Sequence, residues 1–235
     1  MSERNKKGVP KQRVSPRQKM INLMYVVLMA MLALNVSSDV LNGFSLVEDS
    51  LNRTTANASE ANQAIYKNFE EQMKNNPSKV KAWYDKAQLV KRMSDSLYNY
   101  AEELKVRIVR QADGKEGDVR RIRNKEDLEA ASTVMLAPRR GEGEHLYKSI
   151  NQFREQIIGM LVDETQKKII ASNLSTDVPD ESKVLGKGWP EYMFENMPVA
   201  AAVTLLSKLQ SDVRYAESEV LHTLVANIDI KDIRV

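Results

Sequence analysis

The sequence has 235 residues, of which 42% are hydrophobic and 29% are charged, and it contains no cysteine. These proportions are typical of a folded protein of one or two domains and exclude a disordered chain. The lack of cysteine excludes disulfide bonds, thiolate metal sites and cysteine nucleophiles. Glycine and proline are scarce, with nine and seven residues, which favours helices.

The net charge of +3 is unevenly distributed along the chain. Residues 1–19 carry seven basic side chains and one acidic side chain, a net charge of +6, so the remaining residues sum to −3. Basic flanks of membrane segments stay on the cytoplasmic side. We therefore expect residues 1–19 to form a basic cytoplasmic tail. A nucleic-acid-binding arm is the alternative, and it is less favoured because an apolar segment follows directly.

The segment from Met20 to Ser38 contains nineteen residues without a charged side chain. At about 1.5 Å per residue, a helix of this length spans roughly the ~30 Å hydrocarbon core of a bilayer. We expect a single transmembrane helix over residues 20–40. A cleaved signal peptide is the alternative. The length of the uncharged run and the lack of a clear cleavage site favour a retained anchor.

Helical spacing continues beyond the membrane segment. Apolar residues at three- and four-residue steps predict a helix that ends near residue 76. No proline interrupts residues 17–76, which allows this helix to be nearly continuous with the membrane helix. The run from Asn75 to Ser78, NNPS, predicts the end of this helix and the cap of the next.

Three more long helices and one short helix are predicted after this turn. Apolar stripes predict long helices over about 79–111, 144–174 and 198–227. A capped start near Asn124 predicts a short helix that ends at Leu136.

The last loop, residues 175–197, contains a group of aromatic and large apolar residues at Trp189, Tyr192, Met193 and Phe194. We expect this group to cover an end of the helical domain rather than to bind a ligand.

Four long helices with similar apolar stripes can bury one another in an up-and-down bundle. The predicted fold is therefore all-α: a transmembrane helix followed by a periplasmic four-helix bundle over residues 41–227. Charged residues separate the apolar Ile228, Ile230 and Ile233, which we interpret as a strand pattern. Because a lone strand is unstable, we expect residues 228–235 to lead into further β-structure.

Motifs for catalysis or cofactor binding are lacking in the sequence. There is no glycine-rich phosphate loop, zinc-protease motif, hydrolase nucleophile motif or calcium loop. His145 and His222 lie on different predicted helices without neighbouring ligand residues, so capping or packing is a better interpretation than metal binding. We predict no enzyme active site, no metal and no cofactor.

The membrane segment has no carboxylate of its own. Proton-driven machines need an ionisable group, usually a carboxylate, within the membrane. The polar residues here include Asn22, Tyr25 and Asn35, with Arg17 and Lys19 at the cytoplasmic edge. A carboxylate would have to come from a partner, with Arg17 or Lys19 as its counter-charge. Physical chemistry alone favours the alternative, in which both basic side chains contact lipid headgroups and Tyr25 is an interface anchor.

The run SPRQKMINLMY, from Ser15 to Tyr25, precedes an apolar segment that ends in MLALN at Asn35. This run resembles the amino-terminal signature of the GldM/PorM family, inner-membrane proteins of the Bacteroidetes type IX secretion and gliding machinery. The resemblance implies a homodimer whose membrane helices lie inside a pentameric ring of GldL/PorL, a partner with two membrane helices and an acidic residue. It also implies a long periplasmic part that reaches outer-membrane components, including the PorK/PorN ring, through further β-rich domains.

The same resemblance assigns roles to residues of the membrane segment. It implies that Arg17 pairs with the partner's glutamate and that Tyr25 lies near the same proton path. The two residues are separated by about two helical turns, roughly 12 Å along the axis, so they can share a face. Lys19, Asn22 and Asn35 are further candidates for the membrane interface.

We therefore expect a non-enzymatic motor subunit that is driven by the proton motive force. Its amino terminus would be cytoplasmic, its single membrane helix would lie in the bacterial inner membrane, and its bulk would be periplasmic. Its expected partners are a second copy, the GldL/PorL-like ring and the PorK/PorN-like ring, with no nucleic acid. The alternatives are a single-span sensor with a ligand-binding bundle and a passive scaffold of the same topology.

Overall fold

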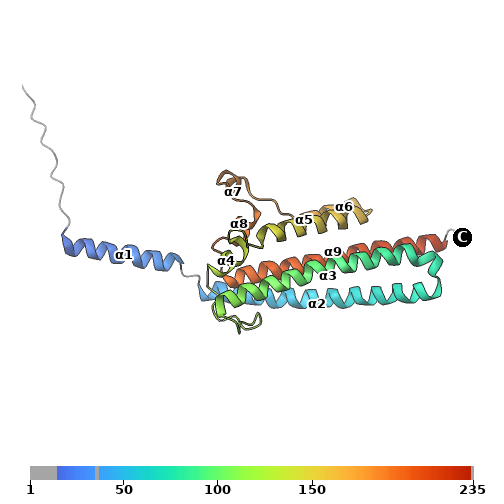
Figure 1. Cartoon of the computed structure of the whole chain (residues 1–235), viewed down its shortest axis with the longest axis horizontal. Helices are drawn as coiled ribbons and strands as arrows, with labels where there is room; N and C mark the ends of the chain where they lie inside the picture. Colours follow the sequence, from blue (N-terminus) through green and yellow to red (C-terminus); the bar gives the residue numbers. More distant parts are fainter. Residues whose placement is uncertain (1–14, 35–36, 234–235) are drawn as a thin grey trace, which may run out of the picture. The chain divides into compact units, whose positions relative to one another are not determined.

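The computed structural model describes residues 15–34 and 37–233, with side chains at residues 15–28 and 37–228. Every regular element within these described residues is a helix, which agrees with the predicted all-α class (Figure 1). The chain divides into two units, Met1–Ser37 and Ser38–Val235. Residues 1–14 of the predicted basic tail, residues 1–19, lie outside the described residues, and residues 16–19 belong to the first helix.

The helix over the predicted membrane segment and the next helix are separate elements. Helix α1 (Pro16–Leu34) belongs to the first unit, and helix α2 (Ser38–Asn75) begins the second. Asp39 lies in the first turn of α2, where a carboxylate complements the positive end of the helix dipole. This start signal explains why a second helix begins at Ser38 although no proline interrupts the segment. Residues 35 and 36 lie outside the described residues.

Helices α2, α3 (Pro77–Asp113) and α9 (Val199–Ile233) are the long elements of the second unit. The predicted break between α2 and α3 is confirmed, since Pro77 opens α3 and the carbonyl of Asn76 accepts hydrogen bonds from the first turn. The predicted end of α3 is also confirmed. Gly114 follows it with φ of 87°, a left-handed conformation that glycine adopts without strain.

The predicted third long helix is two helices, α5 (Gly143–Met160) and α6 (Glu164–Asn173). Asp163 causes the restart, because its side chain accepts a hydrogen bond from Gln166 N at 2.8 Å and so caps α6. The predicted continuous helix over 144–174 is therefore wrong at residues 161–163.

The predicted short helix before Leu136 begins later than expected, as α4 (Ala130–Leu136). The Asp127 carboxylate accepts hydrogen bonds from Glu129 N and Ala130 N, which fixes this start. The Asp113 carboxylate accepts hydrogen bonds from Arg123 N and Asn124 N, so those residues are held in a loop.

Two short helices, α7 (Asp180–Val184) and α8 (Trp189–Phe194), occupy the long loop before α9. Trp189 and Phe194 are buried and contact each other edge to face, with ring centroids 6.0 Å apart. Trp189 also lies against Tyr147 of α5. The two buried rings therefore contribute to the core, in agreement with the predicted covering role, while Tyr192 is exposed.

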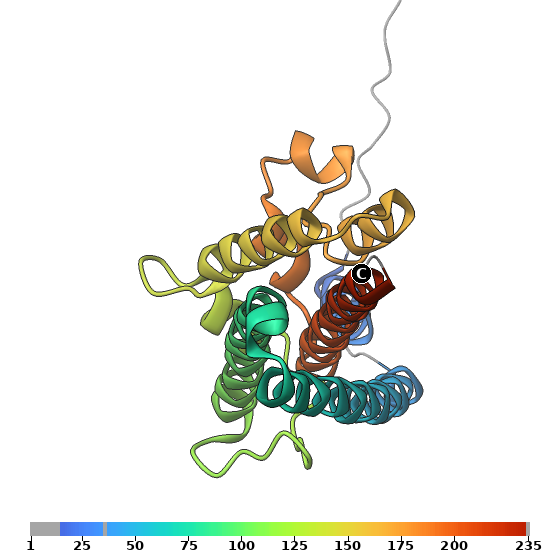
Figure 2. The ribbon, with the colours of Figure 1, turned by 90° about the vertical axis from the view of Figure 1, so that its right-hand side faces the viewer.

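The helix directions differ from the predicted up-and-down order. Helices α2, α5 and α9 run in one direction and α3 runs in the other (Figure 1). The segment from Ser175 to Pro198 returns the chain along the domain, so α9 begins at the same end as α5. Figure 2 shows α9 surrounded by α2, α3 and α5, and all three contact it. The sequence pattern specifies which faces are apolar but not the path of a long connection.

The predicted strand at the carboxyl end is wrong for residues 228–233, which continue helix α9. Ile228 is buried one helical turn after the buried Leu224, so it extends the helical stripe rather than a strand. The alternation that suggested a strand is too short to override this longer period. Residues 234 and 235 lie outside the described residues.

Candidate functional site

The start of α1 is fixed by its own sequence. Ser15 caps the helix, since its hydroxyl accepts a hydrogen bond from Gln18 N at 3.2 Å and its carbonyl accepts one from Lys19 N at 3.0 Å. Pro16 occupies the first helical position, where its missing N–H costs no hydrogen bond. Arg17 therefore lies in the first turn of the helix.

The candidate site residues on α1 are exposed. The side chains of Arg17, Lys19, Asn22 and Tyr25 are accessible, and Tyr25 is 65% exposed. Asn22 Oδ1 accepts a hydrogen bond from Gln18 Nε2 at 3.2 Å. Asn35 lies outside the described residues.

Helical geometry separates these side chains into two faces. At about 100° per residue, Arg17 and Tyr25 differ by roughly 80° around the axis, whereas Arg17 and Lys19 differ by roughly 200°. Arg17 and Tyr25 can therefore contact one partner surface, and Lys19 points away from it.

Apolar side chains of α1 are exposed all around the helix. Every residue from Met20 to Leu28 is exposed, including Met20 at 69% and Met24 at 70%. Within the described part of the chain, no helix combines the length and the apolar character that a membrane span requires. The predicted span over 20–40 includes residues 29–36, whose side chains lie outside the described residues.

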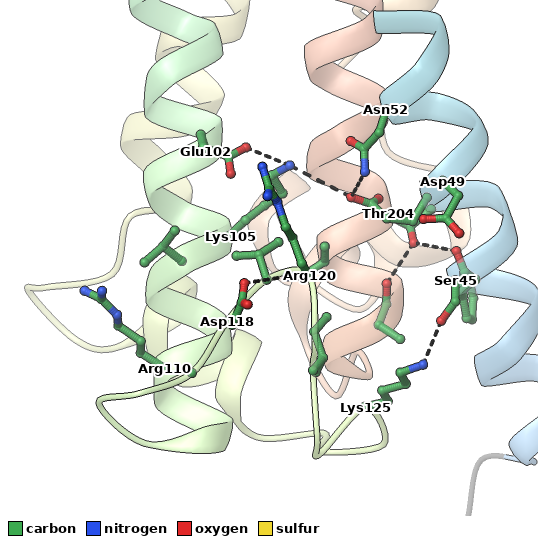
Figure 3. A pocket seen from close by; sticks show the side chains of 18 of the residues that line it. Ser45, Asp49, Asn52, Glu102, Lys105, Arg110, Asp118, Arg120, Lys125 and Thr204 are labelled. Carbon is green, nitrogen blue, oxygen red and sulfur yellow. Dashed lines mark hydrogen bonds and ion pairs between the residues drawn. The ribbon is translucent and has the colours of Figure 1, made fainter. Parts of the chain in front are cut away.

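The second unit contains a cavity of about 950 Å³ between α2, α3, α9 and the loop that follows α3. Figure 3 shows its side chains. Its walls carry both signs of charge, with acidic groups such as Asp49 on α2 and basic groups such as Arg120 and Lys125 on the loop. Lys125 Nζ donates a hydrogen bond to Ser45 Oγ at 2.9 Å and thereby joins the loop to α2.

A buried lysine lies beside this cavity. Lys105 of α3 is 3% exposed, and its Nζ lies 2.8 Å from Glu102 Oε2 and 3.9 Å from Glu48 Oε1. It also donates a hydrogen bond to Ser207 Oγ of α9 at 3.0 Å, and that hydroxyl donates to Glu48 Oε1 at 2.6 Å. We call Glu48, Lys105 and Ser207 the first polar layer, since they join α2, α3 and α9.

The pKa of the Glu102 carboxyl reflects its contacts with Lys105 and Gln210. Its partial burial acts to raise its pKa, but hydrogen bonds from Lys105 and Gln210 outweigh burial and hold the pKa below its usual value. The other oxygen of Glu48, Oε2, is buried and has no hydrogen-bond partner among the described residues.

A second group of polar residues joins the same three helices further along. Glu217 of α9 is 1% exposed and accepts hydrogen bonds from Tyr66 Oη at 2.6 Å and Asn62 Nδ2 at 3.1 Å, both on α2. Arg214 Nη1 lies 2.8 Å from Glu217 and 2.9 Å from Asp95 of α3. These five residues are the second polar layer.

Burial and neighbouring charges together set the pKa values of the second layer. It raises the pKa of Tyr66 well above the usual range, and the neighbouring Glu217 charge raises it further. Burial acts to lower the pKa of Arg214, but Glu217 and Asp95 outweigh that effect and raise it. Arg214 also lies over the Tyr98 ring, 4.4 Å from its centroid.

His145 and His222 do not form a metal site among the described residues. His145 Nδ1 lies 2.9 Å from Tyr100 Oη at the start of α5, in a cluster with Glu142 and Arg107. His222 is exposed on α9, so packing is the wrong interpretation for it. Across the described residues, no group of three or more histidine, cysteine or acidic side chains could hold a metal ion.

The polar layers were not predicted from the sequence, although a signal exists. Ser207, Gln210, Arg214 and Glu217 recur at three- and four-residue steps along α9. The apolar stripe through Leu206 and Val213 dominated the interpretation of this helix. Two parallel stripes, one apolar and one polar, indicate a helix that is buried on more than one side.

A family comparison identifies the second unit. The family model of the GldM N-terminal domain matches residues 39–227. The chain belongs to the GldM family. This membership indicates a component of the gliding and type IX secretion machinery, as the amino-terminal resemblance implied. The matched region covers the helical domain of α2–α9 up to residue 227 and begins after α1. A comparison with curated proteins finds no match.

Proposed function

We propose that this GldM-family chain is a non-enzymatic motor subunit of the bacterial inner membrane. In this proposal α1 crosses the membrane once, with the amino terminus in the cytoplasm and the helical domain in the periplasm. The proton motive force acts where α1 meets a partner ring that supplies a membrane carboxylate, as in GldL/PorL. The helical domain carries the resulting motion toward outer-membrane components such as the PorK/PorN ring.

The observation that carries the proposal is the exposure of apolar side chains around the whole of α1. In α3 and α9 the apolar stripes are buried against neighbouring helices, whereas Met20, Met24 and Val26 of α1 are at least 65% exposed. A helix that presents apolar side chains on all sides needs apolar surroundings, which lipid or partner helices supply. Arg17 and Lys19 in its first turns fit the basic cytoplasmic flank of such a helix.

Arg17 and Tyr25 form the proposed contact with the partner carboxylate. A guanidinium can bind a carboxylate through two parallel hydrogen bonds and lower the carboxylate pKa. Proton binding to the carboxylate would weaken this pair, so each proton that passes would release and reform the contact between α1 and the ring. Tyr25, on the same broad face, would line the path. Lys19 points away from this contact, so Lys19, Asn22 and Asn35 are further candidates for contacts with other parts of the partner ring, and a second copy would complete the homodimer.

A ligand sensor is the second candidate function, and the cavity beside Lys105 is the observation that favours it. Its volume of about 950 Å³ falls within the range of small-molecule sites, and its walls carry both acidic and basic groups. A sensor would bind a small molecule there and signal through α1.

Purification from native membranes under mild detergent separates the candidates, with stoichiometry measured by mass spectrometry and the complex imaged by electron microscopy. The motor predicts co-purification with a small protein of two membrane spans, in a ring around two copies of this chain. A dimer without such a protein would contradict the motor and support a scaffold. A dimer that instead retains a small molecule in the cavity would support the sensor.

A further inference from the structure

Both polar layers join the same three helices, and they do so in matching order. The first layer takes Glu48 from α2, Lys105 from α3 and Ser207 from α9. The residues of the second layer have higher numbers than those of the first layer on α2 and α9, and lower numbers on α3. This order is expected because α3 runs antiparallel to α2 and α9. Ser207 and Arg214 are seven residues apart, so the layers are separated by about 10 Å along α9.

Much of the remaining interface between these helices is apolar and contains small residues, although polar side chains such as Gln210, which donates to Glu102 Oε2 and to the Tyr98 carbonyl, are buried there too. Ala87 and Ala101 of α3 and Ala216 of α9 are buried. Apolar side chains of similar size tolerate exchange of one neighbour for another, because dispersion and the hydrophobic effect have no direction. An apolar interface alone therefore resists sliding of one helix past another only weakly.

The polar layers behave differently, because their contacts depend on position. A slide of one helical turn, about 5.4 Å, would remove Tyr66 Oη and Asn62 Nδ2 from hydrogen-bond distance of Glu217. Glu217, which is 1% exposed, and the partly buried Arg214 would keep each other but lose their partners on α2 and α3, which is unfavourable. The native register supplies the hydrogen bonds and ion pairs described for both layers, although Glu48 Oε2, Asn62 Oδ1 and Arg214 Nε have no hydrogen-bond partner among the described residues.

We propose that the two polar layers lock the axial register of α2, α3 and α9, so that this three-helix unit transmits displacement as a rigid strut. The lock is a property of the helical domain. Its use in transmission rests on the proposed motor function.

The second layer is the better target for a test. Glu48 and Lys105 line the cavity, so water can replace lost contacts in the first layer, whereas no residue of the second layer lines the cavity. Asp95 is 41% exposed at its side chain and can turn to solvent when its partner is removed. The remaining four side chains can be replaced by apolar groups of similar volume.

The test combines Asn62→Leu, Tyr66→Phe, Arg214→Met and Glu217→Leu in the full chain. The matched control is Leu221→Met with Leu224→Met, which alters buried apolar positions of the same helix. Spin labels are attached at Ala61→Cys and His222→Cys, exposed positions of α2 and α9, and the chain has no other cysteine. Labelled chains are diluted with unlabelled ones, and label distances, thermal midpoint and secretion are measured.

The lock predicts that the fourfold variant keeps a thermal midpoint within a few degrees of wild type. Its distance distribution should gain a population displaced by about 5 Å, one helical turn, and secretion should fall at least tenfold. The control should retain one narrow distance and normal secretion. A single wild-type distance in the fourfold variant would overturn the lock. A displaced population with normal secretion would overturn its role in transmission.

Should the fourfold variant not fold, Glu217→Gln gives the same readout with almost unchanged shape. It should broaden the distance distribution and reduce secretion, and an unchanged distribution with normal secretion would again overturn the proposal. Failure of the proposed motor function can be distinguished from failure of the lock. If only the motor function fails, an Arg17 variant secretes normally while the fourfold variant still shows the displaced spin-label distance.

Discussion

Arg17 and Lys19 carry the same charge in the first turns of α1, but the helix places them on opposite sides. The rotation between them is roughly 200°, whereas that between Arg17 and Tyr25 is roughly 80°. Contact with lipid headgroups does not distinguish the two basic residues, since both can reach the interface by extending their side chains. A directed ion pair with one partner carboxylate does distinguish them.

Two substitutions of Tyr25 distinguish the contribution of its ring to the proposed partner contact from that of its hydroxyl. Tyr25→Phe keeps the apolar ring and removes the hydrogen-bonding group, whereas Tyr25→Ala removes both. If the ring fills the interface with the partner, secretion by the phenylalanine variant should stay within about twofold of wild type, and that of the alanine variant should fall about tenfold or more. Secretion of a reporter substrate by cells that express each variant measures this. Wild-type secretion by both variants would remove Tyr25 from the site.

Tyr66 makes the stability of the helical domain sensitive to alkaline pH. Burial raises its folded pKa above the unfolded value of about 10, so above that pH the unfolded state has lost a proton that the folded state keeps. The free energy of unfolding should therefore fall as the pH rises from about 10. Denaturant unfolding between pH 9 and about 11.5 measures this slope.

Tyr66→Phe is the control for this titration. It should lower stability at neutral pH by about 1–3 kcal/mol, because Glu217 loses a hydrogen-bond donor. Its decline above pH 10 should be shallower than that of wild type. An equal slope in both proteins would assign the alkaline effect to other groups, such as Tyr100, whose pKa is also raised by burial and by its hydrogen bond to Glu142.

At the residue scale, the sequence predicted the cap and loop residues better than the buried polar ones. Asn76, Pro77 and Gly114 act locally, so a short window of sequence identifies them. Lys105 and Glu217 look like solvent-facing charges in such a window. Only the packing of α2, α3 and α9 shows that each is buried against a partner more than one hundred residues away.

At the scale of elements, α5 depends on a close approach at its first residue. A side-chain carbon at Gly143 would lie 2.6 Å from Pro190 Cβ and 2.9 Å from the carbonyl of Met135, so only glycine fits without movement. The contact brings the start of α5 against α8. A helix that begins at the solvent-exposed surface has no such neighbouring atoms and does not require glycine at its first residue.

Two substitutions in α5 should therefore have opposite effects. Gly143→Ala should destabilise the domain by about 1–3 kcal/mol through overpacking. Gly159→Ala, where no other atom lies within 4 Å of the new carbon, should stabilise it by about 0.5–1 kcal/mol through helix propensity. Denaturant unfolding of each full-length variant measures both changes. Equal effects of the two substitutions would contradict the packing between α5 and α8.

Helix existence was predictable in this chain, but helix ends and directions were less so. The stripes of α2, α3 and α9 predicted long helices because their period persists over many turns. The restart at Asp163 was missed, although Asp163 and Gln166 have the spacing of a capping pair. The helical end at Ile233 was not predicted, because the short alternation from Ile228 to Lys231 suggests a strand, whereas the long apolar stripe before it continues through Ile228.

At the scale of the whole molecule, family membership and the exposed surface of α1 support one account. The GldM N-terminal domain match covers residues 39–227, and α1 precedes it with the SPRQKMINLMY run at its start. Fold class and family followed from sequence patterns. The parallel arrangement of α2 and α9 did not, because it depends on the path of residues 175–198.

The central claim is that Arg17 couples proton movement to work. Secretion by cells that carry Arg17→Ala tests it most directly, with Lys19→Ala as a control of equal charge change on the opposite side of α1 and with purification to confirm that the dimer assembles. The motor predicts that Arg17→Ala abolishes secretion and gliding while the dimer persists, and that Lys19→Ala retains most of both. Normal secretion by Arg17→Ala, or equal loss in the two variants, would contradict it.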